Sequence, residues 1–397
     1  MNILPVDIRR GDHHYDILVG DLLPGRWLEE IEARAKSDKY FAVIDARAAA
    51  AHDIPARLAG RRGWRITVLP GGEDHKKIAD YAALCESLIA DGVDRRSVVA
   101  AIGGGVVGDL AGFAAATILR GVRLAQVPTT LLAQVDSSVG GKTGINLAGG
   151  KNLLGAFQQP EVVIIDPGFL ATLPEREFRA GMAELVKHGI IADQDFFDRL
   201  AASAGFFAKR DPAFLAEAVA HSCRMKADIV GGDERESGRR ALLNYGHTFG
   251  HVLETLAGYD GSLIHGEAVG VGMALAAKFA ADRGMIGRNG VQRIVLALRR
   301  LGIPVCLDDL PQPLEGRGDW RKRLTADAIL AAMLKDKKAA SAGLTLILPA
   351  DIGDCRARPG VPAAAAAAFM LEALAESGEM AVAPPTGRRY NNKETGP

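Results

Sequence analysis

Apolar and polar positions follow two different patterns along the chain. Between residues 40 and 165, short apolar runs rich in valine, isoleucine and alanine alternate with amphipathic segments. The runs predict strands over 40–45, 65–69, 98–102, 123–127 and 162–165. Residues 77–91 stand between two of these runs and have the spacing of an amphipathic helix. Strands that alternate with helices indicate βαβ units and a mainly parallel sheet.

Pro174 marks a change to helical periodicity. Helices are predicted over 175–188, 213–229, 241–256, 267–283, 291–301 and 326–337, with a strand at 344–348 and a terminal helix over 363–376. Proline often opens a helix and cannot extend a preceding one, so a domain boundary is placed just before it. The sequence thus predicts an α/β domain over 1–173 and a mainly α-helical domain over 174–380. A polar tail over 381–397 is expected to be disordered.

Charge and composition narrow the class of protein. The 397 residues include 48 Lys+Arg and 48 Asp+Glu, and this balance argues against a protein built to bind nucleic acid or an anionic membrane. Glycine is enriched, with 46 residues, which indicates turns and close approaches of the backbone to a ligand. The four cysteines lie far apart and predict no disulfide framework. The N-terminus has no apolar signal segment, and we expect a cytoplasmic protein.

Residues 103–108 form a G-x-G-x-x-G motif between a predicted strand and a predicted helix. Bare amides and a helix N-terminus suit a pyrophosphate, although a tight turn without a ligand is the alternative. An ordinary dinucleotide site has an acid about 20 residues further on, and residues 123–127 contain none. The acids available are Asp45 and Glu73, because Asp109 lies too close to the loop. The motif predicts a dinucleotide site with an altered ribose contact.

Gly141-Lys142-Thr143 resembles the end of a P-loop, but Asp136 stands where the first glycine of that motif would fall. A P-loop NTPase is therefore not expected. Lys142 instead lies in a glycine turn close in sequence to Thr129, Thr130 and Asp136. Such a cluster is typical of a phosphate site, and a solvated basic loop is the alternative.

Three histidines and one glutamate are candidates for a metal site. His247 and His251 are four positions apart on a predicted helix and share one face. The intervening residues lack the glutamate of a zinc peptidase. His265 opens the next helix, and Glu184 lies within a predicted helix. A catalytic zinc commonly takes three such ligands, and the pattern alone leaves all four candidates open.

Together these motifs resemble the 3-dehydroquinate synthase family. The resemblance rests on residues 103–109, 127–138, 140–143, 151–152, 183–187, 240–251 and 265–268. It implies a Rossmann-like NAD-binding domain, a helical metal-binding domain, a homodimer, and the cofactors NAD⁺ and zinc or cobalt. It further implies a carbon–oxygen lyase that converts 3-deoxy-D-arabino-heptulosonate 7-phosphate to 3-dehydroquinate and phosphate in the shikimate pathway. The implied steps are transient oxidation by NAD⁺, β-elimination, re-reduction, ring opening and aldol closure.

The resemblance also implies roles for individual residues. It selects Glu184, His247 and His265 as metal ligands and leaves His251 as a neighbouring proton-transfer or hydrogen-bonding group. The NAD⁺ contacts would be Asp45, Glu73, Lys76, Gly104, Gly105, Asp109, Thr129, Thr130, Asp136, Lys142, Lys151 and Thr172. The substrate contacts would be Lys142, Asn152, Lys187, Lys226, Arg240, Asn244 and Lys337. Arg120 would reach the phosphate in the partner subunit's site.

Small departures and three rivals accompany this interpretation. Ile118 stands where the family often has an aromatic residue, and His188 stands where it often has tyrosine, which we interpret as a packing substitution. A related sugar-phosphate cyclase would share most of the motifs. A metal-dependent NAD polyol dehydrogenase would share the two domains but would not need lysines directed at a phosphate. A binding protein without catalytic activity is the third rival.

Overall fold

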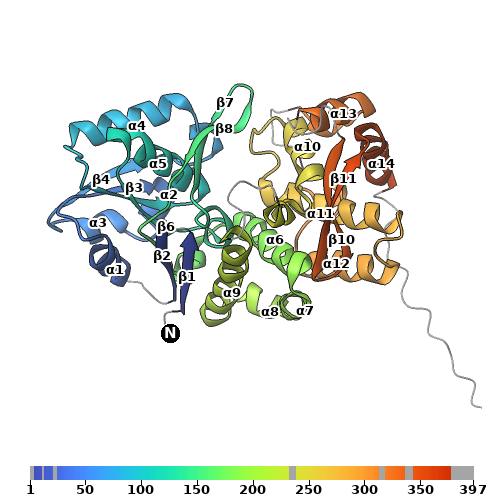
Figure 1. The fold of residues 1–397 in the computed structure, drawn as a ribbon, viewed down its shortest axis with the longest axis horizontal. Coiled ribbons are helices and arrows are strands. Elements are labelled where there is room, and N and C mark those ends of the chain that lie inside the picture. Colours follow the sequence, from blue (N-terminus) through green and yellow to red (C-terminus); the bar gives the residue numbers. More distant parts are fainter. Residues whose placement is uncertain are drawn as a thin grey trace, which may run out of the picture.

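The computed structural model describes residues 4–10, 13–20, 25–231, 238–312, 318–335 and 343–376. A sheet-containing half and a helical half lie side by side, and α6 and α9 run between them (Figure 1). Lys337 and the predicted tail at 381–397 lie outside the described residues. Among the described residues, no helix has both the length and the apolar character needed to cross a membrane.

A seven-stranded sheet, counted over the described residues, has the order β1-β2-β9-β6-β5-β3-β4. Only the β1–β2 hairpin is antiparallel, and the other pairs run parallel. The strands are β1 (Leu4–Arg10), β2 (His13–Val19), β3 (Tyr40–Asp45), β4 (Trp64–Leu69), β5 (Val98–Gly103), β6 (Arg123–Pro128) and β9 (Val162–Ile165). The five predicted strands are confirmed, whereas β1 and β2 were not predicted.

Helices cover both faces of this sheet, because alternate residues of each central strand point to opposite sides. In β3, Tyr40, Ala42 and Ile44 share one core with α1 (Arg26–Ala35), α2 (Ala46–Ala51) and α3 (Ile54–Leu58). Phe41 and Val43 share the other core with α4 (Ile78–Ala90) and α5 (Gly105–Thr117). This arrangement confirms the predicted Rossmann-like layers. It also divides the apolar stretch over 98–119 into a buried strand and a buried helix.

A second hairpin rises from the sheet-containing half toward the helical half (Figure 1). It consists of β7 (Lys142–Leu147) and β8 (Gly150–Phe157), which were not predicted. Gly144 and Gly155 face each other, and a Cβ atom on Gly155 would lie 2.1 Å from the Thr143 carbonyl oxygen. The two strands can therefore pair only with glycine at that point. Lys142, which was expected in a turn, begins β7.

The helical half has α11 (His265–Ala281) at its centre, buried on nearly every side. Around it lie α6 (Glu175–Ala192), α7 (Gln194–Ala202), α8 (Ala204–Ala208), α9 (Pro212–Gly231), α10 (His247–Ala257), α12 (Arg288–Arg300), α13 (Ala326–Leu334) and α14 (Ala363–Ala375). The predicted strand at 344–348 is confirmed as part of β10 (Leu344–Asp351), which pairs with β11 (Asp354–Val361), a strand that was not predicted.

One predicted helix is wrong at its start. Residues 241–256 were expected to form a single helix, but Arg239–Asn244 is a 3₁₀ turn and α10 begins at His247. Gly246 between them has a φ of 79°, and a Cβ atom there would lie 2.7 Å from the Met273 side chain. The chain therefore turns sharply at Gly246, and this turn directs His247 toward α6.

Candidate active site

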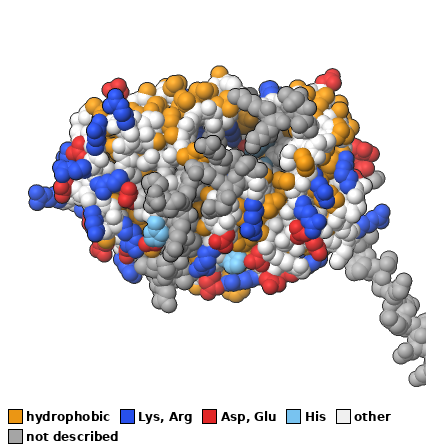
Figure 2. Space-filling model, in the orientation of Figure 1, with side chains coloured by type: hydrophobic (Ala, Val, Ile, Leu, Met, Phe, Trp, Pro, Cys, Tyr) orange, Lys and Arg blue, Asp and Glu red, His pale blue; other side chains and the backbone are white. Residues whose placement is uncertain are grey.

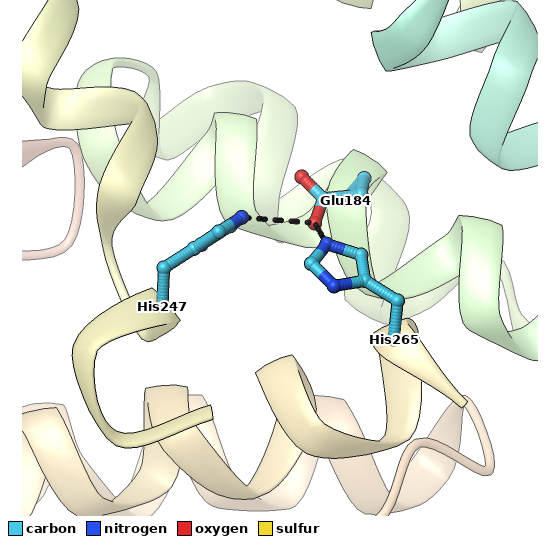
Figure 3. A group of neighbouring side chains, drawn as sticks. All are labelled: Glu184, His247 and His265. Carbon is cyan, nitrogen blue, oxygen red and sulfur yellow. Dashed lines mark ion pairs between the residues drawn. The ribbon is translucent and has the colours of Figure 1, made fainter. Parts of the chain in front are cut away.

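Glu184, His247 and His265 come from three different helices and converge on one point (Figure 3). Glu184 lies in the middle of α6 and is fully buried, while the histidines are the first residues of α10 and α11. Each contributes one ligand atom, and the three atoms lie within 4.8 Å of one another. Nε2 of His265 is 3.5 Å and Nε2 of His247 is 3.8 Å from Glu184 Oε1.

The other ring nitrogen of each histidine has an oxygen partner. His247 donates from Nδ1 to the Tyr245 carbonyl oxygen at 3.1 Å. Nδ1 of His265 lies 3.4 Å from Glu254 Oε2. A proton on Nδ1 leaves the Nε2 lone pair for a metal, so both rings are oriented as ligands. Two imidazoles and one carboxylate form a donor set that suits zinc or a similar divalent ion with one position open.

His251 does not join this cluster. Its side chain is 55% exposed, and its Nε2 lies 4.0 Å from Glu254 Oε2. With Glu254 and His265 it forms a second group of possible ligands. The structure thus brings together the three ligands that the family resemblance selected from the four candidates.

Lys187 lies one helical turn after Glu184 and forms a buried ion pair with its second carboxylate oxygen. Burial raises the pKa of Glu184, but Lys187 and the two histidines outweigh it and hold this pKa well below its usual value. Burial and Lys187 together lower the pKa of His247 to about 3. Burial opposes the charge on His265, yet Glu254 and Glu184 raise its pKa to about 10. A metal ion that binds at these nitrogens must therefore displace the proton of His265.

A second ion pair joins a buried lysine of the helical half to a partly buried carboxylate of the sheet-containing half. Lys226 on α9 donates to the Asp136 carboxylate at 2.6 Å and to its carbonyl oxygen at 2.5 Å. Burial lowers the pKa of Lys226, Asp136 opposes that shift, and the charges of Lys187 and Lys142 add to it. Burial raises the pKa of Asp136, but Lys226 and Lys187 outweigh it and lower this pKa overall. The charged groups that lie together in this region are therefore Lys142, Lys187, Lys226 and Asp136.

Arg240 and Asn244 lie close in sequence in the 3₁₀ turn at 239–244. Arg240 is buried, and a Cβ atom on Gly140 would lie 3.4 Å from one of its guanidinium nitrogens. The loop that leads into β7 thus passes directly beside this guanidinium. Asn244 ends the turn and is exposed. Lys337 was also predicted to contact substrate and lies outside the described residues.

The glycine loop connects β5 to α5, as predicted. Gly104 precedes the first turn of α5, and a Cβ atom on it would lie 3.0 Å from Thr130 Cγ2. A Cβ atom on Gly105 would lie 3.1 Å from Ser137 Oγ. The Thr129 amide donates to the Gly103 carbonyl oxygen at 2.9 Å. The loops after β5 and β6 therefore lie together at the carboxyl ends of parallel strands, where dinucleotides bind in such folds.

Lys76 connects this loop to the β7–β8 hairpin. Its Nζ donates to Asp109 Oδ2 and to Asn152 Oδ1, both at 2.5 Å. Burial raises the pKa of Asp109, and Lys76 opposes that shift. Asn152 has a φ of 53°, and its amide donates to the Asn146 side chain at 2.9 Å. These contacts place Asn152 on the side of the hairpin that faces the glycine loop.

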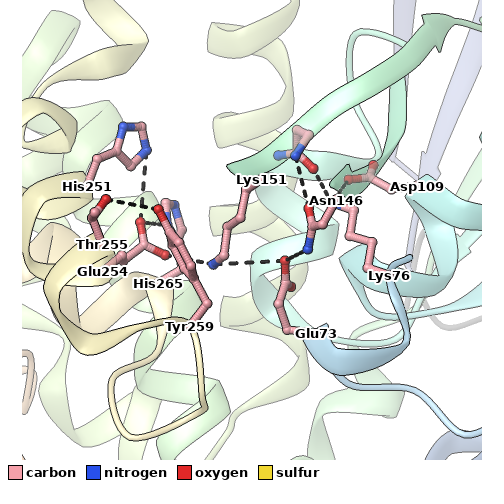
Figure 4. A network of polar contacts seen from close by, with 11 residues as sticks. Glu73, Lys76, Asp109, Asn146, Lys151, His251, Glu254, Thr255, Tyr259 and His265 are labelled. Atoms are coloured by element: carbon pink, nitrogen blue, oxygen red, sulfur yellow. Dashed lines mark hydrogen bonds and ion pairs between the residues drawn. The ribbon is translucent and has the colours of Figure 1, made fainter. Parts of the chain in front are cut away.

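Lys151 extends from the same hairpin to the helical half (Figure 4). Its Nζ lies 3.0 Å from Glu254 Oε1 and 3.9 Å from Glu73 Oε1. The same Glu73 oxygen accepts a hydrogen bond from Asn146 at 2.7 Å. A continuous line of polar contacts thus runs from Glu73, a predicted NAD⁺ contact, to His265, a predicted metal ligand.

Three other predicted residues take no part in this line of polar contacts, although Asp45 lies beside the glycine loop, where a Cβ atom on Gly103 would lie 3.0 Å from the Cβ atom of Asp45. Asp45 ends β3, caps α2 and would clash with any side chain at Gly71. Thr172 Oγ1 lies 2.7 Å from His52 Nε2. Arg120 is exposed just after α5, whose 13 residues separate it from the glycine loop. At 1.5 Å per residue this is about 20 Å, so Arg120 does not join the other predicted residues within one subunit.

Glu254 was missed at the sequence level although it contacts both Lys151 and His265. It follows His247 by seven positions and His251 by three, so the three share a face of α10. That spacing was a usable signal. His188 is fully buried and hydrogen-bonds Ser222 on α9, so it does pack between helices.

Two family models match consecutive parts of the chain. The 3-dehydroquinate synthase N-terminal model matches residues 66–180, and the C-terminal model matches residues 181–339. A curated 3-dehydroquinate synthase from Pelobacter propionicus is 46% identical over 361 residues, which cover 89% of this chain and 95% of that protein. One from Nitrobacter winogradskyi is 46% identical over 380 residues, covering 94% and 97%.

Solved structures of two other cyclases are similar. A 2-epi-5-epi-valiolone synthase from Streptomyces hygroscopicus with NAD⁺ and Zn²⁺ bound has a TM-score of 0.80 and 29% identity, covering 93% of this chain and 99% of that one. A 2-deoxy-scyllo-inosose synthase complexed with carbaglucose-6-phosphate, NAD⁺ and Co²⁺ has a TM-score of 0.79 and 27% identity, covering 92% and 99%. A probable glycerol dehydrogenase from Sinorhizobium meliloti, with a TM-score of 0.62 and 15% identity over 92% of this chain and 97% of that one, shares the fold alone. With both family models matched in order, the chain belongs to the 3-dehydroquinate synthase family.

Proposed function

We propose that this protein converts 3-deoxy-D-arabino-heptulosonate 7-phosphate to 3-dehydroquinate and phosphate, with NAD⁺ and a divalent metal ion as cofactors. The observation that carries the proposal is a cluster of lysines beside the proposed metal ligands, in which Lys187 and Lys226 are buried and Lys142 is exposed. A polyol dehydrogenase needs the glycine loop and the metal ligands, but it has no phosphate to bind. The lysines Lys142, Lys187 and Lys226 therefore favour a cyclase of phosphorylated sugars over a dehydrogenase.

The two cofactors have separate places in this proposal. Glu184, His247 and His265 hold the metal ion, which with NAD⁺ supplies a Lewis acid and a reversible hydride acceptor. The glycine loop, Thr129 and Thr130 provide the cofactor surface, while Asp45 and Glu73 are the acids available to its riboses. Lys76, Asp109, Asp136, Lys151 and Thr172 complete the proposed NAD⁺ contacts. Zinc and cobalt are equally compatible with this ligand set.

The chain's own residues then bind and orient the substrate. A phosphate of about −1.5 to −2 charge and a carboxylate need several cations at short range. We assign this task to Lys142, Lys187, Lys226, Arg240 and Lys337, with Asn152 and Asn244 as hydrogen-bonding partners. Asp136 accepts a hydrogen bond from Lys226 at 2.6 Å and opposes the lowering of the Lys226 pKa by burial, so the side chain is held in place before substrate arrives. His251 is exposed beside the metal cluster and is available to transfer a proton.

One incubation tests this proposal. The purified protein receives the heptulosonate phosphate, a trace of NAD⁺ and Zn²⁺, while phosphate and NADH are measured. We expect phosphate release that greatly exceeds the NAD⁺ supplied, with no net NADH, because the hydride returns in each cycle. Steady NADH formation from a polyol would overturn the proposal in favour of a dehydrogenase. Turnover of sedoheptulose 7-phosphate in place of the heptulosonate would identify a related cyclase instead.

We further propose a homodimer in which Arg120 completes the partner's site. Arg120 and Leu119 both have positive φ values, 66° and 52°, and both side chains are exposed. Gln158 bonds the Val122 carbonyl oxygen at 3.0 Å, which brings the end of β8 near this turn. Exposed apolar side chains also lie on α4 and on the β7–β8 hairpin, and Figure 2 shows hydrophobic side chains along this upper edge of the molecule. They are Ile78, Ile89, Leu147, Leu153, Leu154 and Phe157.

Complementation between two variants tests the shared site. Arg120→Ala and Lys142→Ala are each expected to lower phosphate release at least about 10²-fold on their own. In a mixed dimer, one site receives both substitutions and the other receives neither. We therefore expect part of the activity to return after the two variants are mixed and allowed to exchange subunits. No recovery from a mixture shown to contain mixed dimers would contradict the proposal.

The division into domains is also a proposal, with residues 1–173 as the NAD⁺ domain and residues 174–380 as the metal and substrate domain. It is supported by the end of the sheet at Ile165 and the start of α6 at Glu175. We place the enzyme in the cytoplasm, where its substrate would be made. The four unpaired cysteines are compatible with a reducing compartment.

A further inference from the structure

Glu254 is a buried carboxylate for which the proposed reaction has no direct use. It lies on α10, its side chain is 3% exposed, and both of its oxygens are engaged. Oε2 lies 3.4 Å from Nδ1 of His265, and Oε1 accepts from Lys151 at 3.0 Å. Figure 4 shows Glu254 between these two side chains. A buried carboxylate at this point requires a physical reason, because burying a charge is costly.

The geometry at the two metal-ligating histidines supplies that reason. His247 donates from Nδ1 to the Tyr245 carbonyl oxygen, so its backbone neighbour orients it. His265 is the first residue of α11, and a side-chain oxygen, that of Glu254, lies within hydrogen-bonding distance of its Nδ1. A ligand histidine that donates its second N–H to a carboxylate has a defined tautomer, a defined ring orientation and greater basicity.

Resting on the proposed metal site, we propose that Glu254 is the positioning residue for His265. The carboxylate accepts a hydrogen bond from the N–H at Nδ1 and so directs the Nε2 lone pair toward the metal site beside Glu184. Lys151 balances the charge of Glu254, and the face of Tyr259 lies 4.7 Å from the Lys151 ammonium. Tyr259 is itself held through its hydroxyl by Thr255 at 3.0 Å. His265 is thus connected through Glu254 and Lys151 to Glu73 in the sheet-containing half, which is the proposed cofactor half.

A second cation at His251, Glu254 and His265 is the competing explanation, since their ligand atoms also lie close together. Two features disfavour it. The Lys151 ammonium already occupies one oxygen of Glu254 and would repel a cation beside it. His265 would also have to ligate through both ring nitrogens, which requires an imidazolate. A carboxylate that orients one ligand of a single metal needs neither arrangement.

The test measures metal binding by the full chain, with no substrate present. Metal-stripped wild type, Glu254→Leu and Glu254→Gln are titrated with Zn²⁺ against a chromophoric chelator. Loss of a carboxylate that orients a metal ligand costs about 10–100-fold in metal affinity, and we expect this loss for Glu254→Leu. Glu254→Gln should lose less, because its amide oxygen still accepts from Nδ1. A visible absorption spectrum of the Co²⁺-loaded Glu254→Leu variant should also change, since the ligand ring is no longer fixed.

Glu267→Gln is the matched control. Glu267 is another buried acid, two residues from His265, but it pairs with Arg176 and caps α11 at the Ile264 amide. Glutamine preserves such a cap, so Zn²⁺ affinity should remain within about twofold of wild type. Equal losses in Glu254→Leu and Glu267→Gln would overturn the proposal, as would unchanged affinity in Glu254→Leu. Two bound Zn²⁺ ions per wild-type chain would favour the second site, and no binding by wild type would instead refute the proposed metal site.

Discussion

In the sheet-containing half, which is the cofactor half, the site consists mainly of tightly packed glycine backbone. In the helical half it consists mainly of buried charged side chains. Among the described residues, buried charged side chains of the cofactor half are Lys76 and Asp166, while those of the helical half are Glu184, Lys187, Lys226, Arg240, Glu254 and Glu267. The cofactor half instead has glycines whose added Cβ atoms would meet Thr130 or Ser137 at about 3 Å. One side of the site therefore depends on glycines that leave no room for a side chain, and the other depends on charged side chains.

This difference has energetic consequences. A buried ion keeps its charge only while its partner is present, and removal of one partner leaves the other uncompensated. Substitutions in the helical half should therefore affect metal, substrate and stability together. A glycine substitution in the cofactor half adds volume without leaving a charge exposed or orphaned. Its effect should be smaller and confined to NAD⁺.

Loss of a metal ligand should produce the largest effect. Glu184→Gln removes the carboxylate ligand, and a metal supplies several kcal/mol of transition-state stabilisation, so phosphate release should fall at least about 10³-fold. Zn²⁺ content and turnover are the measurements. Because this variant leaves Lys187 without its buried partner, His247→Asn serves as a second variant that removes a ligand and no formal charge. NAD⁺ affinity should remain unchanged in His247→Asn, and a parallel loss would contradict the separation of the two halves.

Lys142→Ala should be the next most severe change. The side chain is exposed at the start of β7, so the fold should survive its loss. A cation that clamps a phosphate group contributes about 10²–10³ in rate, and turnover should fall by that amount. Phosphate release and thermal unfolding are measured on the same preparation. A normal melting curve with undiminished turnover would refute the assignment of Lys142 to the substrate.

Gly104→Ala tests the glycine loop, where close packing leaves no room for a side chain. The new methyl group would lie 3.0 Å from Thr130 Cγ2 and would intrude on the loop where the pyrophosphate is proposed to bind. Overpacking of this kind costs about 1–3 kcal/mol, which corresponds to a loss of roughly 5- to 150-fold in NAD⁺ affinity. Zn²⁺ affinity should not change. Gly205→Ala is the control, because a Cβ atom there meets nothing within 4 Å; equal effects from both variants would contradict the prediction.

The smallest expected effect concerns pH. Burial, followed by the nearby Lys187, lowers the pKa of His188 to about 3 in the folded protein, against 6.5 for an imidazole in water. The unfolded chain binds a proton below pH 6.5 and the folded chain does not, so this stabilising contribution is complete above pH 6.5 and declines as pH falls toward 3. His188→Phe should make the unfolding free energy less dependent on pH by up to one proton. Denaturant unfolding at pH 7.5 and 5 measures this, and an unchanged pH dependence would refute it.

Much of the fold was predictable because strong apolar runs determine buried parallel strands. The five predicted strands of the sheet appear at the predicted positions, and the glycine loop opens α5 as expected. The hairpins are different: neither strand of β1–β2 or β7–β8 was predicted, and of β10–β11 only β10 was. The β7–β8 hairpin contains four glycines, and most of β8 is exposed. Their pairing depends on distant residues, as Gly144 against Gly155 shows. The break at Gly246 likewise depends on Met273, which is remote in sequence.

By itself, the sequence determined the family, the parallel sheet and the types of residue available for catalysis, because ordered motifs and apolar periodicity are local properties of the chain. Only the tertiary structure decided which of these groups meet. It separated His251 from the Glu184 cluster, placed Arg120 at the far end of α5, and brought Glu254 between Lys151 and His265. These contacts depend on how the helices pack and where glycine turns redirect the chain. Spacing along the sequence places Glu254 on the same face of α10 as His247, but it does not place Glu254 beside Lys151 or His265.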